Sequence, residues 1–177
     1  ENLDLIATTI NMPGVQGKVN RDLLVAAAAI HDSGKTEEYV WEGQPIGMSP
    51  LAHLTTHIAL VAQYIAVTWA KHRDTLEQLG MTDMERRHLE HIVLSHHGKL
   101  EWGSPITPNT VEAEILHQVD MVSAHVRGKI GILTEGEPDQ YGVVTGGRRG
   151  TTVVQAPLAW EERQATLTAV SPARLTR

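Results

Sequence analysis

Histidines and aspartates that can bind metal ions lie near the ends of several helices that the sequence predicts. Ten of the 177 residues are histidine and none is cysteine. Zinc or iron–sulfur sites made of cysteine, disulfides and a thiol nucleophile are therefore excluded, whereas imidazole and carboxylate ligands remain. The adjacent pair His31-Asp32 offers both ligand types, and its carboxylate can bridge two ions. The alternative interpretation is that the pair only closes the end of a helix.

Two further pairs of histidines have spacings that suit metal binding. His53 and His57 are four residues apart, so on one continuous helix both side chains lie on the same face and can share an ion. Two partly exposed histidines with backbone partners would have the same spacing. His96 and His97 are adjacent, and on a helix their side chains point about 100° apart. One of these two is therefore expected to bind a metal, and the other to contact substrate or to favour a helix C-terminus.

A single aspartate lies in the middle of the last expected helix. Asp120 follows His117 by three residues in an otherwise apolar stretch. A carboxylate on a buried face is costly unless it is paired or bound to a metal, although a surface aspartate is the alternative. Histidines and carboxylates that converge from helix ends in a bundle form a site for a divalent ion. Such a site can activate water and neutralise phosphate oxygens.

The elements that would hold these residues are helices whose ends the sequence marks with caps, proline and glycine. The expected helices cover residues 3–10, 20–30 with Asn20 as N-cap, 49–80 from Ser49-Pro50, 82–96 from a Thr82–Glu85 capping box, and 108–126 with a stop at Gly128. The segments between these helices show no strand pattern, so the expected fold class is an all-α bundle. We expect one helical domain over residues 1–128 and a mostly irregular extension over residues 129–177, in which Val153 and Val154 can form a short strand.

Charge and hydropathy restrict the class of partner. Fifteen Lys and Arg residues against 21 Asp and Glu residues give a net charge of −6, which disfavours non-specific binding to duplex nucleic acid. The longest apolar run, residues 23–30, is about a third of a bilayer span, and the first residues lack the basic region of a signal peptide. We therefore expect a cytoplasmic protein without a membrane partner. The compact basic cluster at 146–150 can offer a phosphate contact or form a solvated loop.

Three segments together resemble the HD-domain superfamily of metal-dependent phosphohydrolases, and within it the YhaM-type 3′-5′ exoribonuclease branch. They are residues 31–35 (HDSGK), 91–105 (HIVLSHHGKLEWGSP) and 112–120 (EAEILHQVD). The resemblance extends over roughly residues 20–126 and is most specific in the middle segment. It implies an HD-type hydrolase of phosphate esters that uses two divalent ions, either Mn²⁺, Fe²⁺ or Mg²⁺, with Ni²⁺ or Zn²⁺ as further candidates.

The resemblance also implies a role for each matched residue. His31 and Asp32 would bind metal, Asp32 would bridge the two ions and take part in catalysis, and Asp120 would complete the metal site. One of His53 and His57, together with one of His96 and His97, would hold the second ion. Catalysis and substrate binding would further involve Lys35 at a phosphate, with Lys99, Glu101 and Trp102 on the loop beside the histidines.

The chain departs from the family pattern at three points. No histidine precedes His31, and chain position predicts that the first metal histidine of the superfamily falls just before Glu1. Ser123 stands where a second family aspartate is expected. The OB-like RNA-binding domain of the exoribonuclease branch has no counterpart in these residues.

Two classes of function follow from the sequence. The first is a phosphohydrolase or phosphodiesterase that acts on a nucleotide or on single-stranded RNA or DNA, and the negative net charge favours the small nucleotide. The alternative is a non-catalytic HD module for nucleotide binding or assembly, or the HD domain of a larger, relaxase-like DNA-processing protein. Both classes of function are compatible with a homo-oligomer and with a domain that belongs to a larger, multidomain protein.

Overall fold

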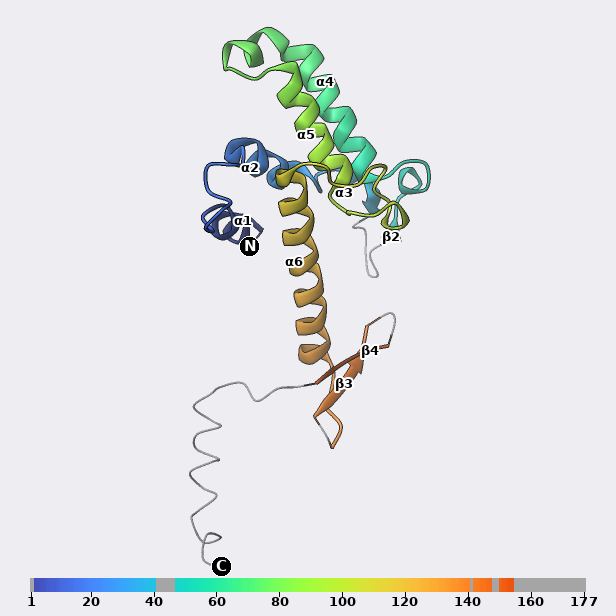
Figure 1. Cartoon of the computed structure of the whole chain (residues 1–177). Coiled ribbons are helices and arrows are strands. Elements are labelled where there is room, and N and C mark those ends of the chain that lie inside the picture. Colours follow the sequence, from blue (N-terminus) through green and yellow to red (C-terminus); the bar gives the residue numbers. More distant parts are fainter. Residues whose placement is uncertain (1, 41–46, 141, 148–149, 155–177) are drawn as a thin grey trace, which may run out of the picture. The chain divides into compact units, whose positions relative to one another are not determined.

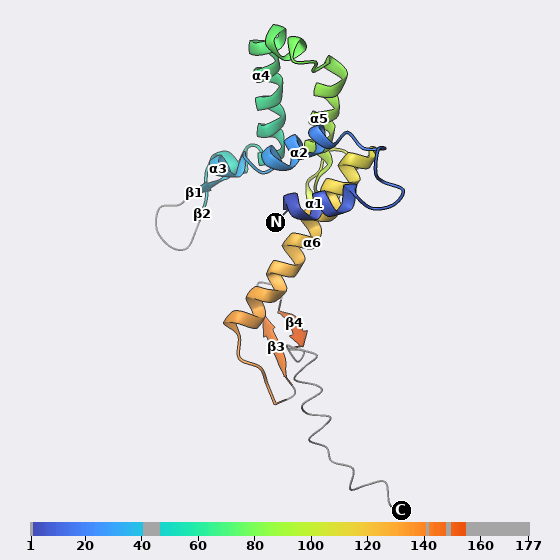
Figure 2. The ribbon, with the colours of Figure 1, turned by 90° about the vertical axis from the view of Figure 1, so that its left-hand side faces the viewer.

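The computed structural model describes residues 2–40, 47–140, 142–147 and 150–154. The chain divides into two compact units, Glu1–Ser123 and Ala124–Arg177, and the long helix α6 contributes to both. Figures 1 and 2 show the helices from two perpendicular directions. No helix among the described residues is long and apolar enough to cross a membrane.

Short and long helices build the first unit. They are α1 (Asn2–Ile10), α2 (Arg21–Ile30), α3 (Lys35–Glu38), the 3₁₀ helix η1 (Leu51–His53), α4 (His57–Gln78), α5 (Asp83–Ser95), the 3₁₀ helix η2 (Leu100–Trp102) and the first part of α6 (Val111–Glu135). Helices α4 and α5 lie side by side as a hairpin, and α2 packs against α5 (Figures 1 and 2). The core between them includes fully buried Leu24, Ile92 and Leu116. The expectation of a mainly helical fold is confirmed.

Local capping signals place several helix ends where the sequence predicts them. The Asn20 side chain accepts a hydrogen bond from the Leu23 amide at 3.1 Å and caps α2. Thr82 and Glu85 form the predicted capping box of α5. Because each of these contacts spans only three residues, the sequence alone is enough to predict it.

The prediction of one continuous helix over residues 49–80 is wrong. Ser49-Pro50 starts only η1, where the Ser49 hydroxyl accepts from the Ala52 amide at 3.2 Å. Thr56 then adopts an extended conformation (φ −96°, ψ 155°), and its side chain accepts from the Ala59 amide as the N-cap of α4. A second cap interrupts the helix here, so His53 and His57 do not share one helix. Between the helices expected at 20–30 and 49–80, the described residues form α3 and a short antiparallel pair, β1 (Tyr39–Val40) and β2 (Gly47–Met48).

The predicted end of the last helix at Gly128 is also wrong, because α6 continues to Glu135. Gly128 keeps a negative φ and is tolerated at a cost of about 1 kcal/mol relative to alanine. In the second unit, β3 (Val143–Gly146) pairs antiparallel with β4 (Thr151–Val154), which confirms the strand expected around Val153 and Val154. Part of the expected irregular extension is therefore ordered. Residues 148–149 of the basic cluster and residues 155–177 lie outside the described residues.

Candidate metal centre

Four segments that are distant in sequence bring the predicted histidines and aspartates together. His31 and Asp32 follow α2, His57 is the first residue of α4, and the pair His96-His97 follows α5. Asp120 lies within α6. Among the described residues, two groups can hold a metal ion, one made of His31, Asp32 and His96 and the other of His57, His96 and His97. The aspartate in α6 adjoins the first group, since its Oδ1 lies 3.7 Å from His31 Nε2.

Each of the four clustered histidines is oriented through its Nδ1 atom. The Nδ1 contacts are His31 to the Ala28 carbonyl (2.9 Å), His57 to Glu38 Oε2 (2.9 Å), His96 to the Val93 carbonyl (2.7 Å) and His97 to the Trp102 carbonyl (2.8 Å). Carbonyl and carboxylate oxygens accept hydrogen bonds, so Nδ1 carries the proton in each ring. In the neutral imidazoles, Nε2 is then the atom with a lone pair for a metal.

These lone pairs converge on the Asp32 carboxylate. Nε2 of His57 and of His96 lie 3.5 and 3.8 Å from Asp32 Oδ1, and Nε2 of His31 lies 3.5 Å from Asp32 Oδ2. Two ligand atoms that each lie about 2.1 Å from one ion are separated by roughly 3–3.5 Å. Asp32 therefore presents its two oxygens to different histidines, as a bridging carboxylate does.

Several polar atoms of the cluster are buried without a hydrogen-bond partner in the described part of the protein. Among the described residues, Nε2 of His31, His57 and His96 and Oδ1 of Asp32 are buried and make no hydrogen bond. Each such atom costs about 1–3 kcal/mol when it stays unsatisfied. Divalent cations held by the two groups would satisfy these four atoms, and nitrogen with oxygen donors suits Mn²⁺, Fe²⁺, Zn²⁺ or Ni²⁺. The residues present therefore fit a metal ion.

Not every predicted site residue joins the cluster. His53 is exposed in η1 and belongs to neither of the two groups, so the geometry favours His57 as the ligand. The Lys35 ammonium pairs with Asp32 Oδ2 at 2.7 Å. Burial raises the pKa of Asp32, but the hydrogen bond from Lys35 and the charge of His31 bring that pKa below its usual value.

Three of the four predicted substrate-binding residues, all except Lys35, lie at η2, shortly after His97. Lys99 and Glu101 are exposed, and the Trp102 side chain keeps 44% of its surface exposed. The Lys99 ammonium lies 4.4 Å from the centroid of the Trp102 ring. The backbone carbonyl of Trp102 orients His97, so this loop is attached directly to the histidine cluster.

Sequence inspection did not identify two residues that support the cluster. Glu38 is buried and contacts His57, and His117 Nδ1 contacts the His96 carbonyl at 2.8 Å. The sequence gives a weak signal for His117, because this histidine lies three residues before Asp120 on the same helix. It offers none for Glu38, which lies in a stretch that reads as a polar loop.

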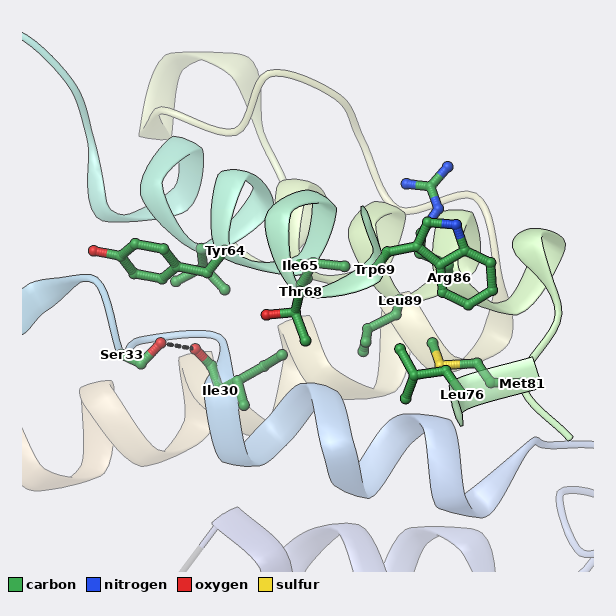
Figure 3. Close-up of a pocket in the computed structure, with 11 residues that line it drawn as sticks. Ile30, Ser33, Tyr64, Ile65, Thr68, Trp69, Leu76, Met81, Arg86 and Leu89 are labelled. Atoms are coloured by element: carbon green, nitrogen blue, oxygen red, sulfur yellow. Dashed lines mark hydrogen bonds between the residues drawn. The ribbon is translucent and has the colours of Figure 1, made fainter. Parts of the chain in front are cut away.

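An apolar cavity of about 310 Å³ is lined in part by Ile30 and Ser33, which flank His31 and Asp32 in the sequence (Figure 3). Helices α4 and α5 and the end of α2 form its walls, which include Ile65, Trp69 and Leu89. Ser33, the residue after Asp32, reaches its edge and donates a hydrogen bond to the Ile30 carbonyl. The residues that line the cavity include no histidine or carboxylate, so the candidate metal ligands lie in the cluster and not in this cavity.

Replacing Gly98 by alanine should destabilise the protein far more than replacing Gly80. Both glycines have positive φ (+81° and +91°), which costs an alanine about 1–2 kcal/mol. A Cβ at Gly98 would also lie 2.2 Å from the His117 ring, whereas a Cβ at Gly80 would meet nothing within 4 Å. Overpacking adds about 1–3 kcal/mol, so urea unfolding should separate the variants by that amount. Equal losses of stability would show that the contact with His117 has no energetic consequence.

The metal-free protein should lose stability as the pH falls from 6.5 to about 5. Burial lowers the pKa of His96 to about 3 from the ordinary 6.5, so the unfolded chain takes up a proton in this range and the folded protein does not. This contribution is complete above pH 6.5 and should shrink by about 2 kcal/mol by pH 5. The pKa of His57 is also lowered by burial and acts in the same direction.

His31 should offset part of this loss. Burial lowers its pKa, but the nearby carboxylates of Asp120 and Asp32 outweigh burial and raise it, so His31 contributes stability that is lost as the pH rises through its folded-state pKa. Urea unfolding at pH 7 and pH 5 in chelator checks the net slope, and His96→Gln should flatten it. Stability that rises toward pH 5 would contradict the prediction.

Comparison with known proteins confirms the resemblance to the YhaM branch of HD-domain proteins that the sequence motifs indicate, because curated proteins of that name match most of this chain. The chain is 37% identical over 131 residues to the 3′-5′ exoribonuclease YhaM of Listeria welshimeri, and equally so to that of Bacillus pumilus. The YhaM protein of Oceanobacillus iheyensis is 34% identical over 132 residues.

These matches cover 70% of this chain but only 37% of each relative. The chain thus spans little more than a third of the length of the curated relatives it matches. No family model matches the sequence. No solved structure matches it either.

Proposed function

We propose that this domain is a metal-dependent phosphodiesterase that removes nucleotides from the 3′ end of single-stranded RNA. The observation that carries the proposal is the set of buried, unpartnered ligand atoms around Asp32, because a divalent ion fits them and water-excluded metal centres suit phosphate chemistry. The relatives named as 3′-5′ exoribonucleases support RNA as the substrate, in place of the small nucleotide that net charge alone favours.

We assign the ligands to two ions. His31, Asp32 and Asp120 would hold one ion, and His57 with His96 would hold the other, with His97 beside it. Divalent ions bound there would polarise the phosphate and lower the pKa of a water molecule. The protein itself would hold the imidazole lone pairs in a fixed orientation through the Nδ1 contacts before substrate binds.

Lys35 would bind a phosphate oxygen. Its ammonium group already lies at the edge of the cluster, paired with Asp32 and 37% exposed. Metal bound to Asp32 would weaken this ion pair, since both cations compete for the same carboxylate. The ammonium would then be available to a phosphate on the solvent side.

The loop around η2 would hold the nucleotide next to the scissile bond. Trp102 exposes part of its indole, on which a base can stack, and stacking of this kind contributes about 1–3 kcal/mol per base. Lys99 lies against the same ring and would contact the backbone phosphate. Glu101, exposed between them, would accept hydrogen bonds from sugar or base.

The test is hydrolysis of a 5′-labelled single-stranded RNA by protein supplied with Mn²⁺. A ladder that shortens from the 3′ end is expected, and Trp102→Ala should raise KM about 5- to 150-fold while Trp102→Phe retains most of the affinity. Cleavage of bis-p-nitrophenyl phosphate without cleavage of RNA would instead indicate a small-nucleotide hydrolase. Binding of nucleotide without any turnover would indicate the non-catalytic module.

A further inference from the structure

The short helix α3 places one buried carboxylate against the start of α4. Glu38, the last residue of α3, is 6% exposed. One of its carboxylate oxygens accepts a hydrogen bond from the His57 backbone amide, and the other accepts from His57 Nδ1 at 2.9 Å. Both contacts are to the same residue, so the carboxylate fixes the backbone and the ring of His57 together.

The position of His57 in its helix explains why a carboxylate is needed. His31 and His96 follow the ends of α2 and α5, and each uses the carbonyl three residues before it as the acceptor for Nδ1. Carbonyls point toward the C-terminal end of a helix, so they are available there. His57 begins α4, where the helix presents N–H groups instead. An acceptor for its Nδ1 must therefore come from another element.

Backbone packing holds α3 in the position that this contact requires. A Cβ at Gly34, just before α3, would lie 2.7 Å from the His57 carbonyl oxygen and 2.9 Å from His57 Cα. Only glycine permits so close an approach without a shift of one backbone. On the other side, the Ser49 amide donates to the Glu38 carbonyl at 2.7 Å. The start of α3 thus packs closely against the start of α4, and the end of α3 is bonded to the segment before η1, independently of the side-chain contact.

We propose that Glu38 is a positioning residue that holds His57 in the Nδ1–H tautomer and thereby sets the affinity of the ion bound by His57 and His96. The inference rests on the metal-binding part of the proposed function. With the proton on Nδ1, the lone pair of Nε2 points to Asp32 Oδ1, 3.5 Å away. The carboxylate also polarises the imidazole, which makes it a better metal ligand.

The test compares Glu38→Ala and Glu38→Gln with Glu37→Gln in the whole 177-residue chain. Glu37→Gln removes the same charge one residue earlier, where the exposed side chain contacts the Tyr64 hydroxyl and no histidine. The glutamine at position 38 keeps one acceptor oxygen but cannot accept both hydrogen bonds, so it should give an intermediate effect. Thermal unfolding first establishes that each variant is folded at the temperature of measurement.

Two readouts are used. In metal-free protein labelled with ¹⁵N-histidine, the His57 ring, assigned by its loss in His57→Asn, should show Nδ1 protonation in the wild type and in Glu37→Gln. In Glu38→Ala it should show a mixture of tautomers. Titration with Mn²⁺ followed by electron paramagnetic resonance should show one of two sites weakened about 10- to 100-fold in Glu38→Ala, and unchanged in Glu37→Gln.

The outcomes separate this inference from the proposed function. If Glu38→Ala and Glu38→Gln keep the Nδ1–H tautomer and the wild-type Mn²⁺ affinities, Glu38 does not position His57. If the wild type binds no Mn²⁺, the proposed function fails, and the part of the inference that concerns metal affinity fails with it. The tautomer measurement still shows whether Glu38 holds His57 in the Nδ1–H form. If both sites weaken equally in Glu38→Ala, the residue has a general structural role, and the inference is overturned.

Discussion

Replacing Asp32 by asparagine is expected to remove both metal ions and to lower the rate of phosphodiester hydrolysis about 10³-fold or more, which corresponds to about 4 kcal/mol of transition-state stabilisation. The reason is geometric. Asp32 is the residue whose two carboxylate oxygens face His57 and His96 on one side and His31 on the other. An amide keeps the shape of the side chain but loses the charge and one of the two oxygen donors. Metal content and kcat/KM measured on the same preparation check this.

Asp22→Asn is the matched control. Asp22 lies in the first turn of α2, at the end opposite to Asp32, and its exposed carboxylate contacts Arg21. Losing that charge should change neither metal content nor activity, and should cost at most about 1 kcal/mol of stability through the helix dipole. An Asp32→Asn protein that retains two ions per chain would show that the carboxylate is not a bridge. Retained ions with lost activity would assign Asp32 a role in the reaction alone.

Removing bound metal is expected to lower the thermal unfolding temperature by about 8–16 °C. A ligand present at about 1,000 times its dissociation constant stabilises the folded state by about 4 kcal/mol, and in a chain of this size each kcal/mol corresponds to about 2–4 °C. The physical source is the burial of three imidazole nitrogens and one carboxylate oxygen that make no hydrogen bond among the described residues. Calorimetric or circular-dichroism melting with and without EDTA, followed by Mn²⁺ addition, measures the shift.

Asp32→Asn again provides the internal control, because a protein that cannot hold the ions should melt at the same temperature with and without EDTA. The metal-free wild type should remain folded, since the core formed by α1, α2, α4, α5 and α6 does not include the predicted metal ligands. An unfolding temperature that is insensitive to both EDTA and Mn²⁺ in the wild type would contradict a structural metal centre and would favour the binding-module alternative.

The sequence predicts the parts of this fold that depend on neighbouring residues. The caps at Asn20 and Thr82 and the end of α5 near His96 are set by hydrogen bonds that span three or four residues. Two predicted helix ends, at Ser49 and at Gly128, are wrong for different reasons. After Ser49, Thr56 provides a second N-cap, which interrupts the expected helix. Gly128 does not adopt a positive φ, and a glycine without positive φ need not end a helix.

From the sequence alone, the possible types of metal ligand can be limited, because ten histidines without cysteine leave imidazole and carboxylate as donors. The motifs also predict that His31-Asp32 and His96-His97 belong to one metal site. The preference for His57 over His53, which stays a prediction, and the role proposed for Glu38 both come from the tertiary structure, because they depend on how α3 meets the start of α4. Helix propensity and capping act within a few residues, whereas a metal centre is defined by atoms that packing brings together from segments far apart in the chain.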